Sequence, residues 1–268
     1  MNRQRLQAIG DFLQREYIDS GRFPGASLAI MHRGALVHRT VHGFADIAGG
    51  RAMAADTIVR IYSMTKPITS VALMMLVEDG RVQLDDPVER FVPEWRDLGV
   101  WVAGTIETGF RTRRPERPMQ VVDLLRHTAG LTYGFQYSSN VDAAYRAKGI
   151  GEVQKSGTLD GMIADLAAIP LAFSPGDGWL YSVATDVVGW LVQVVSGQPF
   201  EEFVHERILG PLGMADTGFA VRDGQESRLA SCYVRGADGA LVVQDDCRTS
   251  SFLRPPAFVS GGGGLVST

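Results

Sequence analysis

The hydrophobic positions near the N-terminus predict a helix followed by a β-hairpin. Apolar residues recur at steps of three and four between Leu6 and Tyr17, which is typical of an amphipathic helix. Residues 27–46, "SLAIMHRGALVHRTVHGFAD", then carry two apolar, partly alternating runs that are interrupted near Gly34. Two such runs around a short break indicate a pair of antiparallel strands.

The pattern becomes helical in the middle of the chain. Residues 68–77 are apolar on every side and precede Asp79-Gly80, so we expect a helix that is buried all round. A second apolar helix is expected between the loop "FSPGDGW" and Ser196-Gly197, with short helices and turns before it. The stretch before Asp160 is polar and irregular, and strand character returns only at residues 231–244.

This order of elements predicts an α+β fold. The pattern shows no alternating strand–helix units and no internal repeat, which disfavours a doubly wound parallel sheet. We expect an α/β sandwich with an antiparallel sheet, formed by residues 1–60 and 228–268, and a mainly helical domain at residues 61–227. The active site is expected at the interface of these two domains.

Composition narrows the class of protein. The 268 residues are 45% hydrophobic, which suits one large core or two small ones. A net charge of −4 argues against a nucleic-acid-binding protein, although residues 111–118, "RTRRPERP", gather four arginines. We expect these arginines to form a solvated face, with an anion-attracting rim as the alternative. The sequence shows no secretory signal and no apolar run long enough to span a membrane, so a cytoplasmic location without membrane contact is expected.

The cysteine and histidine residues do not suggest a metal site. Cys232 and Cys247 fit neither a CxxC motif nor a zinc spacing, and we expect both to be reduced thiols. The five histidines form no HExxH-like pair. We therefore expect no metal and no cofactor.

Residues 61–69, "IYSMTKPIT", contain the first candidates for catalysis. Ser63 and Lys66 lie three positions apart, so both side chains share one face of a helix. Because proline is tolerated only in the first turn of a helix, Pro67 places the helix start at or just after Ser63. The Ser63 hydroxyl would then lie beside free backbone N–H groups and the positive end of the helix dipole, which suits an acyl oxyanion.

A lysine can play a part here that an arginine cannot. A buried lysine amine can accept the proton of a serine, whereas an arginine guanidinium stays protonated. Only Lys66, Lys148 and Lys155 among the 26 cationic residues are lysines. The S-x-x-K spacing can arise by chance, but it is also a nucleophile motif of β-lactamases and penicillin-binding enzymes.

Tyr181, in "LYSVATD", is the candidate for passing the proton to the leaving group. A tyrosine at the start of a helix is more often a packing residue. Here the preceding loop and the following helix match the second element that is expected with the S-x-x-K motif. No G-x-S-x-G elbow occurs in the chain, which disfavours a Ser-His-Asp arrangement on an α/β-hydrolase fold.

Several stretches in order carry a resemblance to one family. They are "YSMTKPITSVALMMLVEDGRVQLDDPVERFVPEW", "LLRHTAGLTYG", "SPGDGWLYSVATDVVGWLV", "ILGPLGMADTGF" and "GGGGLVST". The chain resembles the serine hydrolases of the class C β-lactamase fold, and most closely the family VIII carboxylesterases. The resemblance implies a β-lactamase/transpeptidase-like fold.

The resemblance also implies roles for individual residues. Ser63 would be the acylated nucleophile, Lys66 its partner, and Tyr181 the group that shares proton transfer and protonates the leaving group. Tyr133 would lie on the rim of the acyl pocket. Val183 and Asp186 are assigned to substrate binding, although Asp186 also fits a charge in the first turn of a helix.

The chain departs from the family pattern in two places. Val183 stands where β-lactamases and cell-wall peptidases carry an asparagine, and a valine cannot hydrogen-bond an amide of the substrate. No K-T-G, W-G-G or H-x-G element follows Tyr181. The first departure favours an esterase over a β-lactamase.

The expected function is hydrolysis of small-molecule, short-chain carboxylic esters through a Ser63 acyl-enzyme. A β-lactamase or D-amino-acid peptidase, an acyltransferase and a non-catalytic scaffold on the same fold are the alternatives. The segment Gly261–Gly264 followed by "LVST" makes a poor terminus, because glycines in a stretch that ends free gain no partners to offset their cost of ordering. Together with the missing element, this segment leads us to expect that the C-terminal part of the fold is lacking.

Overall fold

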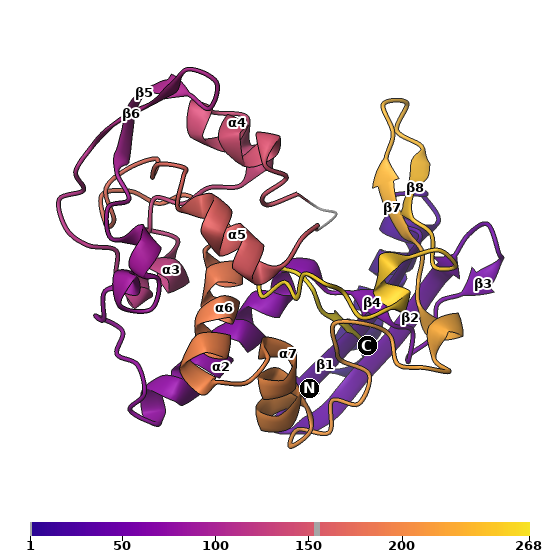
Figure 1. Ribbon diagram of the computed structural model, residues 1–268. Helices are drawn as coiled ribbons and strands as arrows, with labels where there is room; N and C mark the ends of the chain where they lie inside the picture. The colour runs from indigo at the N-terminus through magenta and orange to yellow at the C-terminus, as the bar shows by residue number, and fades with distance from the viewer. Residues whose placement is uncertain (1, 153–155) are drawn as a thin grey trace. The chain divides into compact units, whose positions relative to one another are not determined.

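The computed structural model describes residues 2–152 and 156–268 and divides into two compact units (Figure 1). The first unit comprises the chain up to Arg60, Asp216–Pro255 and Val266–Thr268. The second unit comprises Ile61–Ala215 and Pro256–Leu265.

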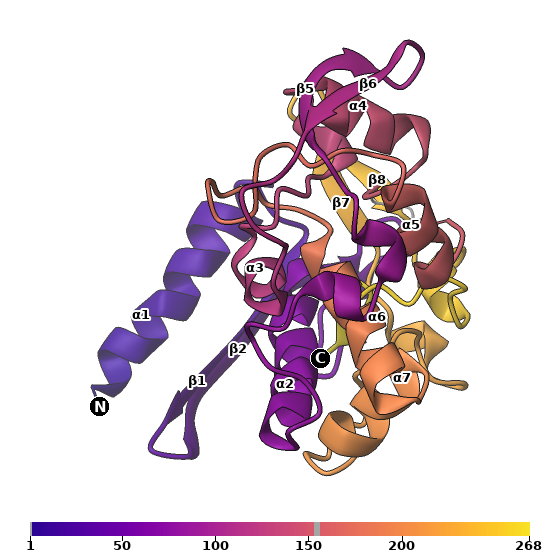
Figure 2. The ribbon, with the colours of Figure 1, turned by 60° about the vertical axis from the view of Figure 1, so that its left-hand side comes forward.

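The first unit contains the predicted N-terminal helix and hairpin. Its elements are α1 (Arg3–Leu13), η1 (Gln14–Ile18), β1 (Gly25–His32), β2 (Ala35–Asp46), β3 (Arg51–Ala52), β4 (Val59–Arg60), η7 (Glu226–Arg228), β7 (Cys232–Arg235), β8 (Leu241–Asp245), η8 (Ser251–Leu253) and β9 (Val266–Ser267). β1, β2 and β3 pair in that order as an antiparallel sheet, and α1 runs beside the β1–β2 hairpin (Figure 2). Arg33 and Gly34 join the first two strands with φ angles of 51° and 78°, as a tight two-residue hairpin turn requires.

The remaining strands of this unit also pair antiparallel. β7 pairs with β8, which confirms the predicted return of strand character, and β4 pairs with β9. Cys232 and Cys247 form no disulfide bond among the described residues.

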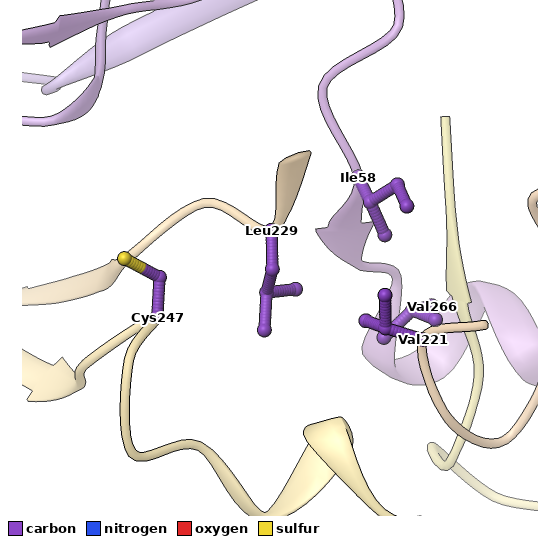
Figure 3. Close-up of a cluster of buried hydrophobic side chains, with 5 residues drawn as sticks. All are labelled: Ile58, Val221, Leu229, Cys247 and Val266. Atoms are coloured by element: carbon purple, nitrogen blue, oxygen red, sulfur yellow. The ribbon is translucent and has the colours of Figure 1, made fainter. Parts of the chain in front are cut away.

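A small apolar cluster joins distant parts of the sequence in the first unit (Figure 3). Leu229 is fully buried and lies beside Ile58, whose backbone N–H donates to the carbonyl of Arg228 at 3.0 Å. The cluster consists of Ile58, Val221, Leu229, Cys247 and Val266.

The second unit is mainly helical. Its elements are η2 (Tyr62–Met64), α2 (Thr65–Glu78), η3 (Val88–Arg90), η4 (Pro93–Trp95), β5 (Val100–Thr105), β6 (Gly109–Arg113), α3 (Val121–Arg126), η5 (Gly134–Gln136), α4 (Asn140–Ala147), α5 (Leu159–Leu166), α6 (Ala184–Ser196), α7 (Phe200–Val204) and η6 (His205–Leu209). α2 packs against α6 (Figure 1). A Cβ atom on Gly189 of α6 would lie 3.0 Å from the ring of Phe200, so this glycine lets α7 approach closely.

The start of α2 is confirmed where the sequence predicted it, but its burial is not. Pro67 occupies the third position of α2, inside the first turn. Val71 and Met74 are 50% and 37% exposed, so the expected burial on all sides is wrong. The reason is that α6 and α7 cover one face of α2, which carries the buried Ala72, Leu73 and Leu76.

Three other parts of the second unit differ from the sequence prediction. The β5–β6 hairpin and α4 were not predicted, and β6 takes up part of the arginine-rich stretch that we expected to be a loop. Arg111 and Arg113 lie exposed in β6, whereas Arg117 donates two hydrogen bonds to the buried Asp123. Residues 153–155 of the stretch predicted to be irregular lie outside the described residues.

No helix in residues 2–152 and 156–268 is long and apolar enough to cross a membrane.

Replacing Leu229 with alanine tests the apolar cluster. Leu229→Ala is expected to lower the free energy of unfolding by about 2–5 kcal/mol, because it removes a fully buried side chain and leaves a cavity. Chemical denaturation measures the loss. Leu36→Ala in the same unit is the control, since Leu36 is 52% exposed and its truncation should change stability by less than about 0.5 kcal/mol. Equal losses in the two variants would contradict the assignment of Leu229 to a core.

Candidate active site

The start of α2 presents Ser63 and Lys66 on one face, as the spacing predicted. Tyr62, just before the serine, has a φ angle of 43°, in the left-handed region that bulky residues rarely adopt. This turn leads into η2 and leaves Ser63 exposed. The Lys66 amine, which is partly buried, donates a hydrogen bond to Ser63 Oγ at 3.2 Å.

Tyr181 reaches the same point from the loop before α6. Its hydroxyl lies 2.6 Å from Ser63 Oγ, and Lys66 Nζ lies 4.6 Å from the centre of its ring. The structure thus brings together Ser63, Lys66 and Tyr181, although 118 residues separate the serine from the tyrosine.

Tyr133 also contacts the lysine. Its hydroxyl accepts a hydrogen bond from Lys66 Nζ at 3.3 Å, and the residue is only 5% exposed. Burial raises the pKa of the Tyr133 phenol well above its usual value, and the charge of Asp186 and the neighbouring Tyr181 raise it further. The Tyr133 hydroxyl is therefore protonated at neutral pH.

Exposed aromatic rings beside these tyrosines were missed by the sequence analysis. Phe135 is 45% exposed and stacks on Tyr133, with 4.7 Å between the ring centres. Trp179 is 66% exposed, and its ring stacks near that of Tyr181 with 6.4 Å between centres. The signal that could have identified Trp179 is its place in "DGWLY", because a large apolar residue in a polar surface loop often contributes to binding.

The glycine segment Gly261–Gly264 forms part of the site. Lys66 Nζ donates to the carbonyl of Gly262 at 2.7 Å, and the Thr69 hydroxyl donates to the carbonyl of Gly261 at 2.7 Å. These glycines therefore have hydrogen-bond partners within the second unit. Close approach explains the composition, because a Cβ atom on Gly261 would lie only 2.6 Å from the carbonyl oxygen of Thr185.

Val183 and Asp186 lie behind the site and are fully buried at the start of α6. Asp186 Oδ1 accepts hydrogen bonds from the Ser260 hydroxyl and from the Gly262 N–H, the second at 2.9 Å. Neither Val183 nor Asp186 has an exposed surface with which to contact a substrate directly.

His127 is a further residue of the site that the sequence analysis did not identify. It ends α3 in the left-handed conformation, with a φ angle of 58°, and its Nδ1 lies 3.1 Å from Ser182 Oγ. Its ring centre is 4.8 Å from that of Tyr181. Burial lowers the pKa of His127 to about 4, with a further contribution from the charge of Lys66, so the imidazole is neutral at neutral pH.

In the described part of the chain, no group of three or more His, Cys, Asp or Glu side chains is placed to hold a metal ion. The chemistry that this arrangement can perform is proton exchange between a serine hydroxyl, a phenol and an amine.

The sequence of nearly the whole chain is similar to that of known proteins. The family model described as Beta-lactamase matches residues 10–268. Protein Rv1367c of Mycobacterium tuberculosis is 38% identical over 256 residues, which cover 95% of this chain and 61% of that protein. Esterase EstB of Burkholderia gladioli is 33% identical over 281 residues, which cover 98% of this chain and 66% of the esterase.

A solved structure confirms the predicted fold. EstCE1, described as a hydrolase with promiscuous acyltransferase activity, superposes with a TM-score of 0.80 at 28% identity, covering 98% of this chain and 69% of that one. The chain thus spans 61–66% of the length of the two curated relatives. It has the β-lactamase/transpeptidase-like α+β fold, and from the family match and the identity to its relatives, the chain belongs to the beta-lactamase family.

Proposed function

We propose that this protein is a serine hydrolase of the family VIII carboxylesterase type, which cleaves small-molecule, short-chain carboxylic esters through a Ser63 acyl-enzyme. The observation that carries the proposal is the position of Ser63 Oγ, within hydrogen-bond distance of both Tyr181 Oη and Lys66 Nζ. EstB, a relative over nearly the whole chain, is named an esterase, which supports the same chemistry.

The hydrogen bonds suggest the route of the proton. Lys66 donates to Ser63 Oγ, so the hydrogen of the Ser63 hydroxyl is free to point at Tyr181 Oη, 2.6 Å away. As Ser63 attacks the ester carbonyl, its proton passes to the Lys66–Tyr181 pair, which before this transfer must hold one proton fewer than an ammonium and a phenol together. The positive charge of Lys66, 4.6 Å from the ring centre of Tyr181, would stabilise the negative charge that develops on the phenol oxygen when Tyr181 later gives a proton to the departing alcohol.

The backbone of Ser63 supplies a donor for the oxyanion. The first turn of a helix leaves its N–H groups without acceptors inside the helix, and in the described residues no hydrogen bond uses the Ser63 N–H. This N–H and the positive end of the α2 dipole would stabilise the oxygen of the tetrahedral intermediate.

The second half of the reaction uses the same groups in reverse. Tyr181 gives its proton to the departing alcohol, and water then attacks the acyl-enzyme while the pair accepts a proton again. Water competes here with any other acyl acceptor. Transfer to an alcohol or amine is the second candidate, because the exposed rings of Trp179 and Phe135 lie beside the proton-transfer groups, where an apolar acceptor could bind.

Removing the nucleophile or the amine tests this mechanism. Ser63→Ala is expected to lower kcat/KM for p-nitrophenyl butyrate by about a thousandfold or more, as loss of a nucleophile does in other serine hydrolases. Lys66→Arg should be almost as damaging, because it keeps the charge and loses an amine that can exchange its proton. Ser70→Ala on the same helix and Lys148→Arg serve as controls and should keep activity. Near-normal turnover in Ser63→Ala or Lys66→Arg would refute the mechanism.

Substrate class gives a second test. Short-chain p-nitrophenyl esters are expected to have a higher kcat/KM than a chromogenic cephalosporin, because the position of Val183 holds a buried apolar side chain and offers no hydrogen-bonding group for the amide side chain of a β-lactam. Steady-state kinetics on both substrates with one enzyme preparation measures the ratio. A cephalosporin value equal to that for the acetate or butyrate ester would restore the β-lactamase alternative.

His127 should make the fold sensitive to acid. Its pKa is lowered to about 4 in the folded chain, against the usual value of 6.5 for a histidine, so the unfolded chain binds the proton more readily. The resulting stability is complete above pH 6.5 and is lost as the pH falls toward 4. His127→Asn, which tolerates the left-handed backbone, should lose less stability across this window in denaturation experiments. His32→Asn, at an exposed histidine, should behave as wild type; parallel curves for wild type and His127→Asn would contradict the assignment.

A further inference from the structure

Asp186 and Lys66 carry opposite charges near the same backbone segment without forming a direct ion pair. Asp186 is fully buried at the third position of α6. None of the ion pairs between described residues includes either side chain. A buried carboxylate loses its hydration, so hydrogen bonds or positive charge in the protein must offset that loss.

Only one of the two Asp186 carboxylate oxygens accepts hydrogen bonds. Oδ1 accepts from the Ser260 hydroxyl and the Gly262 N–H. Oδ2 is buried and has no hydrogen-bond partner in residues 2–152 and 156–268. The first turn of α6 adds the favourable end of a helix dipole, but a positive group is still needed to balance the charge.

Gly262 separates the two charged groups and contacts both. Its N–H donates to Asp186 Oδ1 at 2.9 Å, and its carbonyl accepts from Lys66 Nζ at 2.7 Å. A Cβ atom at this position would lie 2.8 Å from Asp186 Oδ2 and 3.1 Å from Oδ1. Only a glycine therefore lets the backbone lie between the carboxylate and the amine.

The charge of Asp186 acts on the groups around Lys66. It raises the pKa of Tyr133, second only to burial, and the Tyr133 hydroxyl accepts a hydrogen bond from Lys66. Lys66 also donates to Ser63 Oγ and to the Gly262 carbonyl. An ammonium group has three N–H donors, so these acceptors satisfy all of them.

We propose that Asp186 is a positioning residue for Lys66: acting across Gly262, its carboxylate fixes the carbonyl that holds the amine against Ser63 and balances the positive charge of that amine. Asp186 touches neither the substrate nor the reacting atoms. The inference rests on the proposed function, because it gives Lys66 a fixed place and charge during proton exchange with Ser63 and Tyr181.

Asp186→Asn tests the kinetic consequence, since it removes the charge and nearly keeps the shape. We expect kcat for p-nitrophenyl butyrate to fall by about a hundredfold, as when a catalytic group is misplaced, with little change in KM. The limb of the pH–rate profile that depends on the Lys66 charge should move to lower pH. Gly262→Ala, which displaces the carbonyl, should also lower kcat.

Asp142→Asn is the matched control. Asp142 is likewise fully buried at the third position of a helix, α4, but it pairs with Arg146 rather than serving Lys66. This variant should lose stability without moving the pH–rate profile. Asp186→Asn with the kcat and profile of wild type, or the same profile shift in both variants, would overturn the proposal.

A readout without ester substrate separates this proposal from the proposed function. The rate of reductive methylation of Lys66 at pH 7.5, followed by peptide mass spectrometry on the full chain, reports how often the amine is neutral and accessible. In Asp186→Asn it should rise about tenfold, the factor that losing roughly 1.4 kcal/mol of charge interaction produces. Lys148 should be unchanged. If wild type hydrolyses no ester but this rise occurs, the proposed function fails and the positioning role stands; an unchanged rate overturns the positioning role.

Discussion

The packing of α2 against α6 is the constraint on which the site depends. Ser63 and Lys66 stand at the start of α2, and Tyr181 and Asp186 at the start of α6, so the relation between the two helices sets every distance among them. The buried faces of both helices are mainly apolar, and α7 packs against both of them, with Phe200 close to Gly189 of α6, so the close-packed helices have little freedom to slide. A proton route with a 2.6 Å contact needs such a rigid support.

Both helices also direct their positive ends to the same point. The start of α2 can stabilise an oxyanion at Ser63, while the start of α6 stabilises the buried anion of Asp186. Between these ends lies the Lys66 amine, with acceptors for all its N–H groups. The neutral His127 adds no further positive charge at neutral pH. Positive charge in the site is therefore concentrated on one amine whose surroundings are saturated with oxygen acceptors.

Sequence reasoning succeeded where the signal was local. Pro67 predicted the start of α2, Gly197 the end of α6, and the alternation around Gly34 the first hairpin. It failed where partners are distant: Lys66 meets Gly262 across 196 residues, and no local pattern could show that the glycines were there to admit a backbone. α4 was missed for another reason: its apolar face is short, with Val141, Ala144 and Tyr145 buried, and its start depends on a Ser139–Asp142 capping box.

The strained turn at Tyr62 and the glycine segment Gly261–Gly264 lie against each other. Tyr62 adopts a left-handed conformation directly before the nucleophile, which costs about 1–3 kcal/mol for a residue of its kind. A Cβ atom on Gly263 would have the Tyr62 backbone as its nearest neighbour, at 3.7 Å, so the glycine segment runs alongside this turn. The turn at Tyr62 orients the Ser63 hydroxyl. The Gly262 carbonyl accepts a hydrogen bond from the Lys66 amine, which also donates to Ser63 Oγ. Unfavourable backbone conformation at Tyr62 and costly ordering of the glycine segment occur together where the serine and the lysine must meet. The packing of α2 and α6 supplies the free energy that offsets these two costs.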